Sequence, residues 1–116
     1  MPDEIFDHAR EILKKSMEID SPLDIAGIIL FVIPLGCFAR VLSYFSGKEK
    51  KELVNALKRN ETRSFLEITL VVSQFIKNNH LNLETEESSP EIMLRKFAGF
   101  AGKNPDVIGK SLRNLI

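Results

Sequence analysis

Apolar residues are concentrated in two stretches of this chain. The first stretch is uncharged over fifteen residues, from Ile25 to Ala39, and the Ser21-Pro22 pair before it is typical of a helix start. Pro34 interrupts this stretch, because proline lacks the backbone N–H that a continuous helix needs. The pattern therefore predicts two helices, over 22–32 and 35–45, with Gly36 at the corner between them.

The second apolar stretch covers residues 62–77 and carries hydrophobic side chains almost all round the expected helix. A helix that is apolar on most sides is expected in the interior of a domain. Residues 22–45 and 62–77 are therefore predicted to form the centre of the fold.

Shorter segments alternate apolar and polar residues at helical spacing and are expected to cover this centre. Residues 3–19 place on one face Ile5, Phe6, Ala9, Ile12 and Leu13, with Ser16 and Met17 at its end. Residues 48–59 follow a Ser46–Glu49 pair with the spacing of a capping box, and carry a narrow apolar stripe of Leu53, Val54 and Leu57. Two further helices, over 90–101 and 105–115, each begin at a cap-plus-proline pair, after a loop over 80–89.

These segments predict an all-α fold, a compact bundle of six or seven short helices in one domain over residues 1–116. A mixed fold is the alternative, because Ile28–Ile33 and Ile68–Val72 are rich in β-branched residues. Two strands alone form only a marginal sheet, so the all-helical interpretation is favoured.

Composition is ordinary for a globular protein, with 44% hydrophobic and 28% charged residues and a net charge of zero. The charge is nevertheless arranged in blocks along the chain. Residues 1–20 carry six acidic and three basic groups, 48–63 carry six basic and three acidic groups, and 92–116 carry five basic groups and one acidic group. Such blocks are typical of solvated helix faces that pair with each other.

The single cysteine, Cys37, and the acidic N-terminus predict a cytoplasmic protein without a secretion signal. Membrane association through 23–45 is an alternative. As a helix, the uncharged run spans only about 22 Å, which is shorter than the roughly 30 Å hydrocarbon core of a bilayer. Burial inside the domain is therefore the favoured interpretation.

Residues 94–115 resemble the helix-turn-helix of bacterial repressors. Ala98, Gly102 and Ile108 match the small-residue, turn-glycine and buried-aliphatic positions of that family, whereas Lys103 and Ser111 depart from its pattern. The resemblance implies a recognition helix capped by Asn104. Its exposed side would carry Asn104, Asp106, Lys110 and Arg113, with Lys110 or Arg113 reaching base edges or phosphates. An ordinary helical hairpin explains the same residues without DNA and is favoured.

Candidate catalytic residues are few, and no enzyme activity, metal, cofactor or small-molecule substrate is predicted. Cys37 lies in the most apolar part of the chain, where a thiolate is disfavoured. His8 and His80 have no partner at metal-ligand spacing. Gly47-Lys48 lacks the earlier glycine and the Ser or Thr of a phosphate loop. The carboxylates Glu84, Glu86, Glu87 and Glu91 lack the central glycine of a calcium loop.

The sequence therefore favours a non-enzymatic interaction or adaptor protein that acts through a protein–protein surface. Its partner would be another protein or a second copy of the chain, as a homodimer. A small bundle has few helices with which to bury two strongly apolar segments, so part of their apolar surface is expected to be covered by a partner. A small DNA-binding regulator using Asn104, Lys110 and Arg113 is the alternative function.

Overall fold

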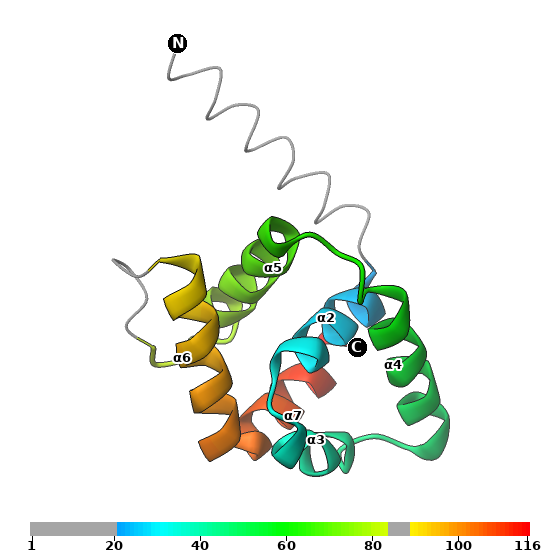
Figure 1. Cartoon of the computed structure of the whole chain (residues 1–116). Helices are drawn as coiled ribbons and strands as arrows, with labels where there is room; N and C mark the ends of the chain where they lie inside the picture. The colour runs from blue at the N-terminus through cyan, green and yellow to red at the C-terminus, as the bar shows by residue number, and fades with distance from the viewer. Residues whose placement is uncertain (1–20, 84–88) are drawn as a thin grey trace.

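The computed structural model describes residues 21–83 and 89–116. Within these ranges the chain forms six α-helices and no strand (Figure 1). The helices are α2 (Pro22–Val32), α3 (Leu35–Leu42), α4 (Gly47–Arg59), α5 (Phe65–Asn78), α6 (Pro90–Lys103) and α7 (Pro105–Leu115). The predicted helical bundle is confirmed and the mixed fold is wrong. The helix predicted over 3–19 lies outside the described residues.

Serine side chains define the starts of four helices. Ser21, Ser46 and Ser89 each accept a hydrogen bond from the backbone N–H three residues later, at 3.2 to 3.3 Å. Glu49 completes the predicted capping box by accepting from the Ser46 backbone N–H at 2.9 Å. Ser64 caps α5 in the same way, which explains why this helix begins at Phe65 and not at residue 62.

The apolar stretch breaks at Ile33 and Pro34, which both have extended backbone angles between α2 and α3. Gly36 lies in the first turn of α3, so its predicted place at the corner is wrong. The residue before a proline is pushed out of helical geometry, and this moves the corner to Ile33–Pro34. Helix α3 also ends earlier than predicted, because Tyr44 and Phe45 bond carbonyls three residues back in a tight final turn.

The core is built mainly by α2 and α5, with contributions from every other described helix. Fully buried side chains include Ile28, Ile29, Val41, Leu53, Val72, Phe97, Ile108 and Leu112. The rings of Phe75 and Phe97 join α5 to α6 edge to face, with their centroids 6.0 Å apart. Both predicted central segments therefore supply much of the buried apolar surface.

Helices α2 and α4 approach each other at Gly27. A Cβ atom on Gly27 would lie 2.7 Å from the carbonyl carbon of Ala56, which is too close for a real contact. The two backbones therefore touch at a position where only glycine fits. This contact explains why Ala56, which is not part of the predicted apolar stripe of α4, is completely buried.

None of the helices in the described ranges combines the length and the apolar character that crossing a bilayer requires.

Candidate functional site

An apolar groove lies on the surface where α2, α3 and α4 meet. Its volume is about 380 Å³. It is lined by Leu30, Phe31, Ile33, Leu35, Phe38, Val54, Leu57 and Glu61, and is named here the α2–α3–α4 groove. Glu61 is the one ionisable residue in this lining, so the groove offers apolar contact and little acid–base chemistry.

Two large apolar side chains of the groove are exposed to water. Leu35 is 89% exposed and Phe31 is 47% exposed. Leu35 is the first residue of α3, directly after the Pro34 corner, so no preceding turn of its own helix covers it. Full burial of a leucine or phenylalanine side chain stabilises by roughly 1.5–3 kcal/mol, and a partner seated on the groove would gain part of this.

Basic residues of α4 lie beside the groove. Lys50 and Lys51 line a neighbouring hollow that shares Val54 with the groove. Lys58 lies one helical turn beyond Val54 and is exposed. The groove is therefore apolar along its floor, with three lysines along its α4 edge and the carboxylate of Glu61 in its lining.

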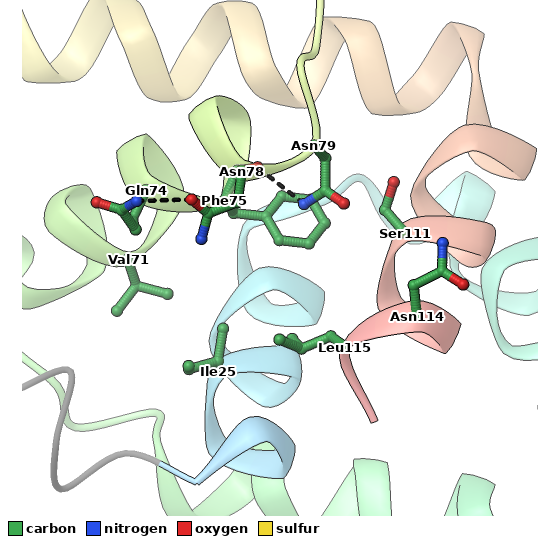
Figure 2. A pocket seen from close by; sticks show the side chains of 9 residues that line it. All are labelled: Ile25, Val71, Gln74, Phe75, Asn78, Asn79, Ser111, Asn114 and Leu115. Atoms are coloured by element: carbon green, nitrogen blue, oxygen red, sulfur yellow. Dashed lines mark hydrogen bonds between the residues drawn. The ribbon is translucent and has the colours of Figure 1, made fainter.

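A second, smaller cavity lies between α2, α5 and α7 (Figure 2). Its volume is about 190 Å³, below the roughly 300–1,000 Å³ that ligand pockets occupy. It is lined by Ile25, Val71, Gln74, Phe75, Asn78, Asn79, Ser111, Asn114 and Leu115. This lining contains amides and a hydroxyl, which can donate and accept hydrogen bonds but do not titrate near neutral pH.

The amide side chains of this cavity are partly bonded to each other and to the backbone. Gln74 donates to the Asn78 side chain at 2.7 Å, and Asn79 donates to the Phe75 carbonyl at 2.9 Å (Figure 2). Ser111, which departs from the helix-turn-helix pattern, is buried at the edge of this cavity. The cavity is therefore a small pocket between helices whose lining mixes apolar side chains with amides.

Cys37 is buried in the first turns of α3, and its thiol donates to the Pro34 carbonyl at 3.1 Å. Burial raises the pKa of this thiol, so the protonated form is favoured and nucleophilic attack is disfavoured. His80 follows the C-terminus of α5 with a positive φ of 51° and closes the helix through its backbone. His8 and the carboxylates Glu84, Glu86 and Glu87 lie outside the described residues.

Among residues 21–83 and 89–116, no group of three or more His, Cys, Asp or Glu side chains is placed to hold a metal ion.

Asn104 connects α6 to α7, but its side chain does not cap α7 as predicted. Its amide instead donates to the Phe100 carbonyl at 3.1 Å, which satisfies the last turn of α6. The prediction is wrong because one residue separates the two helices and its backbone φ of −132° and ψ of 57° are not those of the extended N-cap. Lys103 and Lys110 are both exposed.

Arg113 contacts other parts of the domain. Its guanidinium forms an ion pair with Glu49 of α4 and lies 5.7 Å from the centre of the Phe45 ring. The capping glutamate of α4 is thus also the partner of a residue on α7. Although its side chain is 52% exposed, an arginine paired in this way is less available to a DNA phosphate than Lys110.

Asp106 also faces the domain, at the junction of α3 and α7. Its carboxylate accepts hydrogen bonds from Tyr44 Oη at 2.7 Å and from Arg40 Nε at 2.8 Å. Both bonds lower the pKa of Asp106, and the bond from Tyr44 has the larger effect. The Tyr44 ring lies directly over Gly109, where a Cβ atom would overlap it. Asp106, on the side of α7 predicted to face DNA, is therefore engaged by Arg40 of α3 and by Tyr44 in the turn after it.

The α2–α3–α4 groove was not predicted from the sequence. Phe31 and Leu35 belong to the uncharged stretch, which the pattern assigns as a whole to the interior. The sequence feature that could have indicated the groove is Pro34, because a break at that residue turns the first residue of the next helix, Leu35, outward.

Comparison with known proteins gives no match. No protein family, no curated protein and no solved structure is similar to this chain at a significant level.

Proposed function

We propose that this protein is a non-enzymatic interaction protein that self-associates through the α2–α3–α4 groove. The observation that carries the proposal is the exposure of Leu35 and Phe31 at the rim of an apolar groove. Contiguous exposed apolar side chains on a soluble domain are typical of interaction sites. A groove between helices is also the form in which many proteins receive an apolar helix face.

The placement of the charged groups supports binding rather than catalysis. The carboxylates with lowered pKa values, which include Asp24, Glu67 and Asp106, are held by arginines and hydroxyl groups that join neighbouring residues or helices. They line neither the groove nor the cavity of Figure 2. Their hydrogen bonds and ion pairs therefore stabilise the fold itself.

The test is sedimentation velocity of the purified protein over a wide concentration range, with a groove variant and a matched control. Leu35→Lys places a charge in the groove at a side chain that makes few contacts within the domain. Leu66→Lys makes the same change at an exposed leucine in the first turn of α5, away from the groove.

We expect the wild type and Leu66→Lys to gain mass with concentration, and Leu35→Lys to bind its partner copy roughly 10-fold or more weakly, as expected for losing one buried leucine. A wild type that stays monomeric at high concentration, or equal effects of the two substitutions, would contradict the proposal.

A further inference from the structure

We propose that the occupant of the α2–α3–α4 groove is residues 3–19 of a second copy of the chain, bound as an amphipathic helix. The inference rests on the proposed function, because it takes the same groove as the self-association surface and names the segment that fills it.

The apolar pattern of this segment suits the groove. As a helix, residues 3–19 would be about 25 Å long and present an apolar stripe at the spacing that helix-binding grooves recognise. The stripe consists of Ile5, Phe6, Ala9, Ile12, Leu13 and Met17. Leu35 and Phe31, the exposed side chains at the rim, are the apolar counterparts that it would cover.

The charges of segment and groove are complementary. Residues 1–20 carry six acidic and three basic groups, and the α4 edge of the groove carries Lys50, Lys51 and Lys58 against one carboxylate in the lining, Glu61. Complementary charges at the rim of an interface raise the association rate and disfavour wrong partners. An acidic helix is thus a better match for this edge than a basic one.

The connection to α2 favours exchange between copies. Only Asp20 and Ser21 separate the predicted helix from Pro22. Ser21 has an extended backbone, with φ −67° and ψ 159°, and its side chain is committed to capping α2. The following proline disfavours a helical conformation at Ser21, so this connection is short and stiff. Short hinges favour placing a segment on a neighbouring copy over folding it back.

The resulting assembly is a closed dimer in which each copy donates one segment and one groove. Two variants separate these roles. The groove variant is Leu35→Lys, and the segment variant is Phe6→Ser combined with Leu13→Ser. A control, Lys14→Ser, changes the polar side of the same segment.

Sedimentation velocity of each variant alone, and of an equimolar mixture of the two, tests the proposal. We expect each variant alone to self-associate at least 10-fold more weakly than the wild type, and Lys14→Ser to behave as the wild type does. The mixture should recover a dimer that neither variant forms alone, because the intact segment of the groove variant still fits the intact groove of the segment variant. A cooperative urea unfolding transition shows that each variant is folded.

The possible results distinguish the proposed function from the identity of the segment that fills the groove. If the segment variant dimerises like the wild type while the groove variant does not, the proposed function stands and residues 3–19 are not the occupant. If both variants lose self-association and the mixture stays monomeric, occupancy by a second copy is overturned. A wild type that never exceeds the monomer mass overturns both the function and this inference.

Discussion

Asp24 shows how a single side chain joins two helices. Its carboxylate accepts hydrogen bonds from Arg59 at 2.7 Å and Asn60 at 3.0 Å, at the C-terminal end of α4, and from its own cap Ser21 at 3.0 Å. Burial alone would raise the pKa of Asp24, but these bonds outweigh it and lower the pKa from 3.8 to about 2. The charged form is therefore favoured by the fold.

A carboxylate with a lowered pKa stabilises the folded state above its ordinary pKa, and this stability is lost as the pH falls through the folded value. We expect Asp24→Asn to reduce the free energy of unfolding by about 2 kcal/mol at neutral pH, given the size of the shift. The difference between wild type and variant should shrink between pH 3.8 and about 2. Urea unfolding over a pH series measures it, and a difference that does not depend on pH would contradict the assignment.

At the scale of elements, the contact between α2 and α4 depends on the absence of one side chain. Gly27 lies against the Ala56 backbone, whereas Gly99 in α6 is exposed and has no atom within 4 Å of the position that a Cβ would take. The same substitution at these two glycines should therefore have opposite effects.

We expect Gly27→Ala to reduce the free energy of unfolding by roughly 1–3 kcal/mol, because a backbone contact cannot yield as a flexible side chain can. Gly99→Ala should increase stability by roughly 0.5–1 kcal/mol, since alanine loses less conformational freedom in a helix. Urea unfolding of both variants measures the effects. A neutral Gly27→Ala would contradict the backbone contact between Gly27 and Ala56.

At the scale of the whole molecule, the two functional hypotheses place the active surface on different helices. The self-association proposal uses the apolar groove, and the DNA-binding hypothesis, which stays a prediction, uses the exposed residues of α7. The structure changes how the second hypothesis is tested. Arg113→Glu would break the ion pair with Glu49 as well as any DNA contact, so Lys103→Glu with Lys110→Glu is the cleaner variant.

Because the chain has a net charge of zero, we expect duplex DNA to leave the mass of the wild type unchanged at both low and high salt. Light scattering with and without duplex DNA measures this. A rise in mass at low salt that disappears at high salt and in the Lys103→Glu, Lys110→Glu variant would instead support the DNA-binding regulator.

Several elements of the fold were predictable because their causes are local. The serine caps at Ser21, Ser46 and Ser89 act on backbone groups three residues away, and Pro34 acts on Ile33, the residue directly before it. The end of α3 and the start of α5 were displaced from prediction by a tight final turn and by the unrecognised Ser64 cap. Local signals thus located the helices and missed some of their ends.

The sequence by itself determined that the described part of this chain is helical, where most of its helices start, and which two segments supply most of the apolar surface. These properties follow from hydrogen bonds and side-chain periodicity within a few residues. Only the tertiary structure decided that Gly27 touches Ala56, that Arg113 pairs with Glu49, and that Leu35 stays outside the core. Each depends on residues far apart in the chain, whose meeting is set by how whole helices pack and not by local periodicity.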